Sequence, residues 1–425
     1  MNEQTTHKKR IFTRMGPLIT RKDMLLACRA FLPWRWSQLR RGPHLERAIE
    51  RLRLITGRKQ VYLIDSARSG LLLALRSLSL EPGDEIIVQA YTCMVVLNAI
   101  RHAGGVPVFV DIDERYNIDV TKIEEAITEK TRAIIVQHTF GVLADTRTIL
   151  KITLERDIII IEDSAHIIGV KDSGTPVGTV GDIGVFSFGS EKYISTARGG
   201  AVIINNQVLL DAFETEYKQL QPLEVMKILQ HLMTFIVFPL GKWMYGSIGK
   251  GILAFAARLK ITARIIYPHE RVGRRGSWHP STYPNALASI LIAQLDSLEN
   301  SIKHRHDLTM RYLSAFRKYG ISTQAMDDGT AVMQFAIEVE DPFDLLAYLN
   351  TRGIMVSDSW TGSPIVPRNV NLCKTGYLES QAPIAEHVSG HHVALPTHPN
   401  VSVEDVEWII REVINYYNKK SEGII

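Results

Sequence analysis

An aspartate and a lysine stand at the ends of two apolar runs of the sequence. Asp163 comes directly after the run Ile158–Glu162. Lys192 follows 29 residues later, shortly after the run Ile183–Phe188. Apolar runs without polar alternation are typical of strands buried on both faces of a parallel sheet. Ligands of such sheets bind beyond the carboxyl ends of the strands, so we expect both side chains at a ligand site.

This pair of side chains suits pyridoxal phosphate. The cofactor forms a Schiff base with a neutral lysine amine, and a carboxylate keeps its pyridine nitrogen protonated so that the ring accepts electrons. Its phosphate needs backbone N–H groups such as those at a helix amino terminus. Ser66–Gly70 has this character, because it lies between the β-rich run Val61–Asp65 and an apolar helical pattern. Taken singly, each feature also fits a surface lysine, a capping aspartate or an ordinary helix start.

The elements that would position these residues alternate between β-rich and helical patterns over residues 61–205. This alternation predicts an α/β fold with a mostly parallel sheet covered by helices. The expected strands are Val61–Asp65, Glu85–Val88, Val106–Asp111, Ala133–Gln137, Ile158–Glu162 and Ile183–Phe188, and the expected helices are Ser69–Ser77 and Lys122–Ile127.

The carboxyl-terminal third predicts a second, smaller α/β unit. Apolar residues at helical spacing indicate one long helix over residues 287–318. A strand at Val332–Val339 and helices at Phe343–Arg352 and Val403–Tyr417 follow it.

Composition and charge narrow the class of protein. The 425 residues are 45% hydrophobic and 22% charged, which is typical of globular domains and excludes disorder or a coiled coil for the whole chain. The three cysteines are widely spaced, which favours a reducing compartment and gives no metal-ligand spacing. The amino terminus lacks an apolar signal core, so we expect a cytoplasmic protein. Because the cysteines lack metal-ligand spacing, we expect no bound metal.

Two basic segments stand out from an acidic body. Residues 1–60 hold 15 Lys or Arg against 4 Asp or Glu, and residues 218–275 hold 10 against 2, so their net charges are +11 and +8. The rest of the chain has a net charge of −15. The second segment also contains the apolar stretches Ile228–Leu240 and Trp243–Phe255, each too short to span a membrane.

The ordered motifs resemble those of the DegT/DnrJ/EryC1/StrS aminotransferases, the sugar aminotransferases of fold type I. The resemblance runs from about Gly42 to the carboxyl terminus and omits an insert at 218–275. The matching stretches are SARSGLLLAL (66–75), PGDEIIVQAYTC (82–93), PVFVDID (107–113), HTFGVLAD (138–145), IEDSAHIIG (161–169), GDIGVFSFGSEKYISTARGGAVIINN (181–206) and IAQLDSL (292–298).

The resemblance implies a role for each matching residue. Lys192 corresponds to the lysine that carries the cofactor, and Asp163 to the partner of the pyridine nitrogen. His166 occupies a position beside the cofactor ring that is often Gln or His. The residues expected to hold the cofactor phosphate are Ala67, Arg68, Ser69 and Ser187.

Three positions depart from the family pattern. Cys93 stands where an aromatic side chain usually stacks on the cofactor ring, so Tyr91 is a candidate to supply that stacking. The family's Gly-x-Asn-x-Arg segment, which reaches the neighbouring subunit's phosphate, is not matched around Gly276–Tyr283. Ser363–Val366 replaces a Pro-Leu-His motif in the region expected to contact substrate.

The resemblance further implies a homodimeric transaminase that transfers an amino group from glutamate to a keto sugar, with a nucleotide-linked sugar expected. The product would serve surface polysaccharide or secondary-metabolite biosynthesis. We expect a basic extension at 1–41, a large cofactor-binding domain at 42–300 and a small domain at 301–425. An alternative with the same fold is a regulator that binds pyridoxal phosphate, or an enzyme of this cofactor that acts on no sugar.

The insert has two interpretations. Apolar stretches punctuated by Lys and Arg are typical of segments that lie in the interface of an anionic membrane. The same stretches could instead be buried against the body of the protein or in a dimer interface. We expect no nucleic-acid partner, and a cytoplasmic enzyme that can contact the inner membrane face through residues 218–275.

Overall fold

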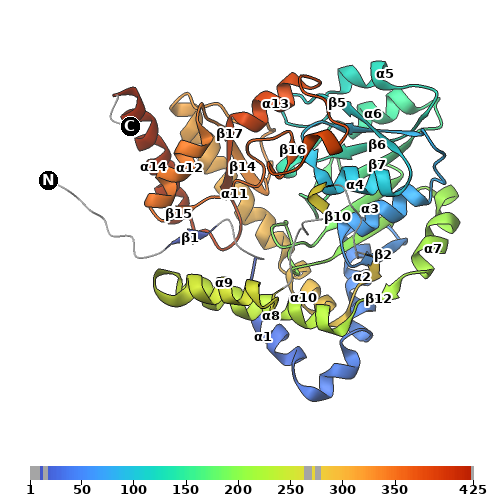
Figure 1. Ribbon diagram of the computed structural model, residues 1–425, viewed down its shortest axis with the longest axis horizontal. Coiled ribbons are helices and arrows are strands. Elements are labelled where there is room, and N and C mark those ends of the chain that lie inside the picture. The colour runs from blue at the N-terminus through green and yellow to red at the C-terminus, as the bar shows by residue number, and fades with distance from the viewer. Residues whose placement is uncertain (1–9, 13–17, 263–269, 273–278, 423–425) are drawn as a thin grey trace.

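The computed structural model describes residues 10–12, 18–262, 270–272 and 279–422. A nine-stranded sheet, in the right-hand half of Figure 1, has the strand order β12-β13-β2-β11-β10-β7-β6-β3-β5. In that order the strands are Gln221–Pro222, Ser281–Thr282, Val61–Ile64, Gly200–Ile204, Ile183–Ser187, Ile159–Ser164, Thr131–Gln137, Glu85–Gln89 and Val106–Val110.

Most of this sheet is parallel, as predicted. Strands β10, β7, β6, β3 and β5 pair in parallel, whereas β11 is antiparallel to both β10 and β2. Strand β11 was not among the strands expected from the sequence, because the residues that lead into it, Ser195–Gly200, are mostly small and have no strand pattern. The strand begins at Gly200, the last residue of that stretch.

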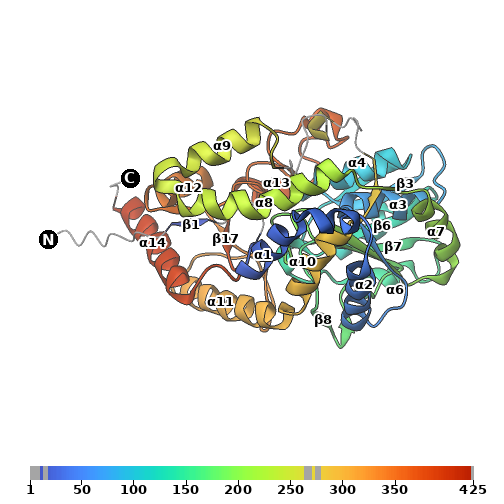
Figure 2. The same cartoon turned by 90° about the horizontal axis from the view of Figure 1, so that it is seen from below.

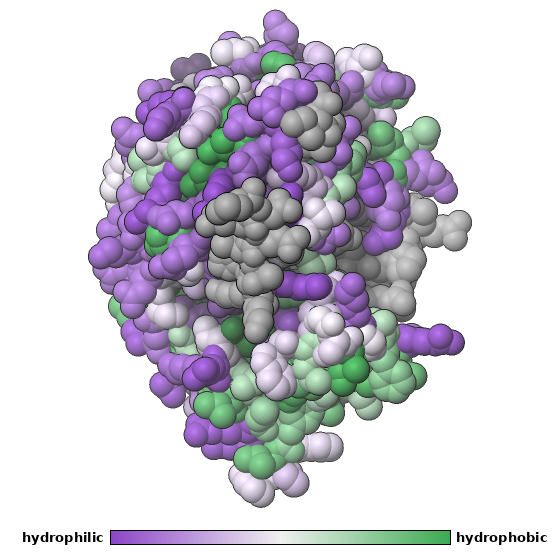
Figure 3. Space-filling model, turned by 90° about the vertical axis from the view of Figure 1, so that its left-hand side faces the viewer, coloured by the Kyte–Doolittle hydropathy of each residue, from purple (hydrophilic) through white to green (hydrophobic). Residues whose placement is uncertain are grey.

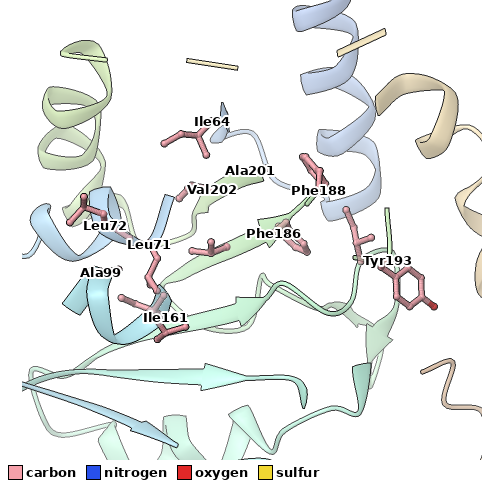
Figure 4. Packing of buried hydrophobic residues seen from close by; sticks show 14 of the residues in the cluster. Ile64, Leu71, Leu72, Ala99, Ile161, Phe186, Phe188, Tyr193, Ala201 and Val202 are labelled. Carbon is pink, nitrogen blue, oxygen red and sulfur yellow. The ribbon is translucent and has the colours of Figure 1, made fainter. Parts of the chain in front are cut away.

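Helices cover both faces of the sheet, which explains the uninterrupted apolar strands. Successive residues of β6 and β7 alternate between two hydrophobic clusters: Ile135 and Ile161 join the larger one, and Ile134 and Ile160 the smaller. Figure 4 shows the larger cluster, where Leu71 extends from a helix toward the sheet and Leu72 lies on the outer side of the same helix. Helices α3 (Ala67–Arg76), α4 (Met94–His102) and α7 (Leu210–Lys218) contribute to the larger cluster, and α5 (Ile123–Ala126) and α6 (Thr146–Thr153) to the smaller one. Residues of α2 (Pro43–Thr56) and α10 (Asn285–Leu295) also belong to the larger cluster.

The long helix expected over 287–318 is two helices, and this expectation was wrong. Helix α10 ends at Leu295, and α11 (Leu298–Lys318) begins three residues later. At the break, the hydroxyl of Ser297 donates to the carbonyl oxygens of Ala293 and Gln294 at 3.3 and 3.1 Å. Serine hydroxyls that bind backbone carbonyls in this way compete with helical hydrogen bonds and bend helices.

A second core lies in the carboxyl-terminal part. Here β14 (Gln334–Glu338) pairs antiparallel with β17 (His392–Pro396). Helices α11, α12 (Pro342–Thr351) and α14 (Val403–Ser421) pack around this pair. The cluster contains the rings of Tyr312, Phe316, Phe335, Trp408 and Tyr416.

Two short strand pairs connect distant parts of the chain. Strand β1 (Ile11–Phe12) runs parallel to β15 (Ile354–Met355), so the amino-terminal segment adds to the small unit. Strand β4 (Thr92–Cys93) runs parallel to β16 (Ile365–Val366) and ties the two units together. The remaining elements are β8 (Lys171–Asp172), β9 (Thr175–Pro176), α13 (Pro383–Gly390) and the short helical turns η1 (Pro33–Gln38), η2 (Val120–Lys122), η3 (Thr139–Gly141), η4 (Gln207–Leu209), η6 (Glu270–Val272) and η7 (Leu372–Lys374).

The basic insert forms two helices joined by a π-helical turn. These are α8 (Val225–Trp243), η5 (Tyr245–Gly249) and α9 (Lys250–Arg258). Helix α8 lies beside α1 (Arg21–Ala30) on the underside of the molecule (Figures 1 and 2). Its inner face joins the main core through Ile228, Leu232 and Phe235. In the parts of the chain that the structure describes, no helix is long and apolar enough to cross a membrane.

The expected division of the chain at 41/42 and 300/301 stays a prediction. The second boundary falls within the first turn of α11. Residues 263–269 and 273–278, which include the end of the insert and the start of the unmatched Gly276–Tyr283 segment, lie outside the described residues.

Candidate active site

A cavity of about 220 Å³ lies at the carboxyl ends of β7 and β10. Its wall combines these strand ends with the start of α3, with the loop between β10 and β11, and with a loop of the small unit. Of the residues predicted from sequence, the cavity is lined by Ala67, Arg68, Cys93, Asp163, His166, Ser187 and Lys192. The position agrees with the expectation for ligands of open α/β sheets.

Asp163 and Lys192 reach the cavity from neighbouring strands. Strands β7 and β10 are parallel neighbours, and Asp163 is the register partner of Val185. Lys192 follows β10 in the loop that leads to β11. Burial lowers the pKa of Lys192, and this effect exceeds the opposing one of the nearby Cys93, Asp163 and Glu191. The site therefore favours the neutral amine, which is the nucleophilic form of lysine.

The carboxylate of Asp163 is buried but has polar partners. Burial raises its pKa, while the charge of Lys192 and the backbone amide of Ala165 lower it. That amide donates to Oδ1 of Asp163 at 3.0 Å. The hydrogen bond fixes one carboxylate oxygen, and the side chain lines the cavity with the other available for a ligand.

His166 is held as a neutral imidazole. Its Nδ1 accepts a hydrogen bond from the amide of Phe140 at 3.1 Å. Burial and the charge of Lys192 hold its pKa well below the ordinary value. The ring stacks on Phe140 and lies edge-on to Trp360, with centroids 6.0 and 5.0 Å apart. These contacts orient the imidazole in the cavity wall.

The start of α3 forms the opposite end of the cavity. Ser66 caps the helix and accepts from the amide of Ser69 at 3.4 Å, so the first turn presents its amides at the wall next to Ala67 and Arg68. A Cβ on Gly200 would lie 2.6 Å from the nitrogen of Ala67, so only glycine lets β11 approach this turn. The free backbone N–H groups at a helix amino terminus bind anions such as phosphate.

Charged residues surround this helix terminus. Arg68 forms a buried ion pair with Glu270. Arg198 pairs with the buried Asp65, with its Nε 3.0 Å from Oδ2, and also lines the cavity. Arg198 was not predicted from the sequence, although it lies within the matching stretch 181–206.

Two predicted residues, Ser69 and Tyr91, lie behind the cavity wall. The hydroxyl of Ser69 donates to Oδ1 of Asp65 at 2.5 Å and so turns toward the helix cap. Tyr91 is fully buried, and its hydroxyl lies 2.9 Å from both the carbonyl oxygen of Trp360 and Nε2 of His392. The stacking expected of Tyr91 is thus wrong for this geometry, since its ring is enclosed by other aromatic rings and does not reach the cavity.

Other cavity residues come from segments without a family motif. Trp360, Val366 and Pro367 reach the wall from the small unit, and Val366 is the register partner of Cys93. The altered segment Ser363–Val366 thus does reach the site. His231 and Thr234 of α8 line the cavity as well, so the insert takes part in forming it. The sequence holds one signal for these two residues. Their spacing of three places His231 and Thr234 on the same side of a helix.

Comparisons with known proteins identify the family. Residues 20–219 and 282–414 match the DegT/DnrJ/EryC1/StrS aminotransferase family. The chain belongs to this family. The match begins at residue 20, earlier than expected, and it leaves out the segment 220–281 that holds α8, η5 and α9.

Individual relatives agree with this assignment. The spore coat polysaccharide biosynthesis protein SpsC of Bacillus subtilis is 26% identical over 396 residues, which cover 88% of this chain and 90% of SpsC. The GDP-perosamine synthase of Escherichia coli O157:H7 is 42% identical over 140 residues, which span 33% of this chain and only 38% of that enzyme. The solved structure of Helicobacter pylori PseC, an aminotransferase of pseudoaminic acid biosynthesis, has a TM-score of 0.75 at 20% identity and covers 97% of this chain and 100% of that chain.

Family membership makes the chain a pyridoxal phosphate-dependent aminotransferase of fold type I. The residues present fit this cofactor. The cavity holds a buried amine, a carboxylate fixed through one oxygen and a helix amino terminus, and the glycine at 200 keeps the backbone beside that terminus open. Lys192, Asp163 and the first turn of α3 would hold the aldehyde, the pyridine nitrogen and the phosphate, respectively.

Proposed function

We propose that this aminotransferase moves the amino group of glutamate to a nucleotide-linked keto sugar. The buried amine of Lys192 beside Asp163 carries the proposal, since this pair supplies the chemistry of amino transfer. The substrate class is supported by relatives whose names refer to GDP-perosamine and to coat polysaccharide. The product would enter surface polysaccharide or secondary-metabolite biosynthesis.

The chain's own residues divide the work. Pyridoxal phosphate, when bound, supplies an electron sink that stabilises negative charge on the substrate carbon. Nζ of Lys192 acts as a general base and acid that moves the proton at that carbon, and burial lowers its pKa in the direction that this role requires. The carboxylate of Asp163 holds a proton at the pyridine nitrogen by electrostatic attraction. His166, held neutral, orients the ring from the wall.

A panel of substrates tests this proposal. Purified protein is incubated with pyridoxal phosphate, glutamate and each of several nucleotide-linked keto sugars, and 2-oxoglutarate and amino sugar are measured together. We expect equal amounts of both with at least one sugar. The alternatives, a cofactor-binding regulator or an enzyme that acts on no sugar, predict cofactor binding without any amino sugar.

We also propose that the enzyme is a homodimer, as the family resemblance implies. Light scattering coupled to gel filtration should give twice the mass of the chain. A monomeric mass in the active protein would contradict this proposal.

We further propose that the insert lets the enzyme contact the cytoplasmic face of an anionic membrane. The outer side of α8, η5 and α9 exposes large apolar side chains, of which Trp243 is 83% exposed and Phe255 59%. The neighbouring η1 exposes two more tryptophans, Trp34 and Trp36. In Figure 3, apolar side chains gather toward the lower edge of the molecule, the part where α8 and α9 lie in Figure 1.

Basic residues accompany these apolar side chains. Lys250, Arg258 and Lys260 lie on α9 or just beyond it and are exposed. Apolar side chains at the acyl boundary and Lys or Arg near anionic headgroups characterise interfacial helices, and each basic residue contributes on the order of 1 kcal/mol. The buried inner face of α8 shows that only part of the insert is available for such contact.

Vesicle flotation tests this contact. The wild type should float with anionic vesicles at low salt. The double variant Trp243→Ser, Phe255→Ser should no longer float with them. Leu154→Ser is the matched control, because Leu154 is 81% exposed at the end of α6 on another side of the molecule. If the double variant floats like the wild type, or if it becomes monomeric instead, the surface does not serve a membrane.

A further inference from the structure

A second cavity, of about 130 Å³, lies against the active-site cavity. The two share five lining residues, among them Lys192 and Gln334. The other walls come from β1, from the end of α8, from α11 and from the segment after β17. None of the roles proposed above for the site residues uses this second cavity.

Cationic side chains dominate the wall of the second cavity. Arg10, Lys242 and Arg305 line it from three different segments. Two acids, Glu191 and Asp405, also line it, and Oδ2 of Asp405 accepts a hydrogen bond from the amide of Ser402 at 2.9 Å, which caps α14.

Arg305 is the most unusual of these cations, because only 1% of it is exposed. Its guanidinium donates to the carbonyl oxygen of Met333 at 3.0 Å and to Oγ1 of Thr397 at 3.2 Å, and it lies 4.4 Å from the ring centroid of Tyr193. Within the described part of the chain, no carboxylate pairs with it. A buried charge without an opposite charge is costly, so a ligand carboxylate would stabilise this arrangement.

Unpartnered polar atoms point to the same conclusion. Among the described residues, Nε of Arg305, Oε1 of Gln334 and Nδ1 of His398 are buried without a hydrogen-bond partner. All three residues line the second cavity. Buried polar atoms are nearly always satisfied in folded proteins, so three in one small cavity indicate a ligand.

Lys242 adds a cation that comes from the insert. It lies at the last turn of α8, with Nζ 5.9 Å from the ring centroid of Phe12. Burial lowers its pKa to about 8. The insert thus contributes to the second cavity as well as to the first, although it lies outside the family match.

We propose that the second cavity binds the distal carboxylate of a dicarboxylic amino donor whose amine reaches Lys192 in the first cavity. The amino transfer from this donor rests on the proposed function, whereas binding of its carboxylate in the second cavity does not. The cavity of about 130 Å³ has room for a carboxylate and a short methylene chain. Arginine and lysine bind carboxylates by strong charge-assisted hydrogen bonds.

Glutarate, which has two carboxylates and no amine, tests the binding directly. Calorimetry on the protein without added pyridoxal phosphate should show binding of glutarate. Lys242→Gln should weaken it about tenfold, which corresponds to about 1.4 kcal/mol, because a charge-assisted hydrogen bond to the carboxylate is lost. Lys242→Arg should retain most of the affinity, and Lys250→Gln, which removes an exposed lysine of the same insert, should leave it unchanged.

Three outcomes would overturn the proposal: no glutarate binding to the wild type, equal affinity in Lys242→Gln, or binding of inorganic phosphate in preference to glutarate. Failure of the proposed function looks different. In that case glutarate binds and depends on Lys242, yet no amino group reaches a sugar. If the proposal holds, Lys242→Gln also raises the KM for glutamate and leaves the KM for the sugar unaltered.

Discussion

The amide of Phe140 donates a hydrogen bond to Nδ1 of His166 over 3.1 Å. Because Nδ1 accepts, the single proton of the neutral imidazole resides on Nε2. Phe140 holds a left-handed backbone conformation, with φ of 56°, in the turn η3 after β6. The turn therefore fixes both the tautomer and the orientation of a ring that lines the active-site cavity.

This relationship predicts different effects for two replacements of His166. His166→Leu removes the acceptor and leaves the buried amide of Phe140 unsatisfied, which should destabilise the fold by about 1–3 kcal/mol. His166→Gln keeps an acceptor oxygen for this amide, so its free energy of unfolding should fall clearly less. Urea unfolding of the two variants measures their free energies of unfolding. Equal losses would show that the hydrogen bond between Phe140 and His166 does not contribute to stability.

Replacement of Asp163 by Asn should separate cofactor binding from turnover. The neutral amide cannot hold the pyridinium proton electrostatically, so kcat should fall by about 10²–10³, the usual cost of losing one electrostatic stabiliser. The cofactor should still bind, since the start of α3 and Lys192 are intact. A kcat within a few-fold of wild type would contradict the role of Asp163.

The same variant has a consequence for pH. The charge of Asp163 raises the pKa of Lys192, while burial lowers it more. Removing that charge should move the Lys192 pKa further down, so the neutral amine persists to lower pH. The pH midpoint for cofactor uptake, followed by visible absorbance, should therefore be lower in Asp163→Asn than in wild type. A shift to higher pH would show that the two groups do not interact as described.

Gly200→Ala tests the close approach of β11 to α3. Its Cβ would lie 2.6 Å from the nitrogen of Ala67 and 2.8 Å from the carbonyl oxygen of Phe186, so the backbone must move. We expect a loss of about 1–3 kcal/mol in stability and weaker cofactor binding. Gly251→Ala in α9 is the control, because nothing lies within 4 Å of its Cβ and alanine favours a helix by up to about 1 kcal/mol. Equal behaviour of both variants would refute the steric argument.

The sequence predicts most of the sheet and the centre of the site because both depend on local patterns. Buried strands such as β7 have uninterrupted β-branched residues, Asp163 lies at the carboxyl end of β7, and Lys192 lies in the loop that follows β10. The break between α10 and α11 was missed, since Ser297 acts through a hydroxyl that periodicity does not register.

Contacts between distant segments could not be predicted in this way. Trp360 and Arg305 reach the cavities only because the small unit packs against the sheet, and no motif marks either residue. Tyr91 illustrates the reverse error, since its position two residues before Cys93 suggested the cavity, whereas its ring packs against Trp360 and His392 in the aromatic cluster.

The central claim is that Lys192 carries the amino transfer, and one comparison tests it most directly. Wild type and Lys192→Ala are each incubated with pyridoxal phosphate, glutamate and a nucleotide-linked keto sugar accepted by the wild type, and 2-oxoglutarate and amino sugar are quantified while the visible absorbance of the protein is recorded. For the wild type we predict equimolar products and an absorbance band of covalently held cofactor. For Lys192→Ala we predict neither the products nor this band. The thermal unfolding curve of the variant, followed by circular dichroism, should match that of the wild type. An unaltered band and full turnover in Lys192→Ala would contradict the account.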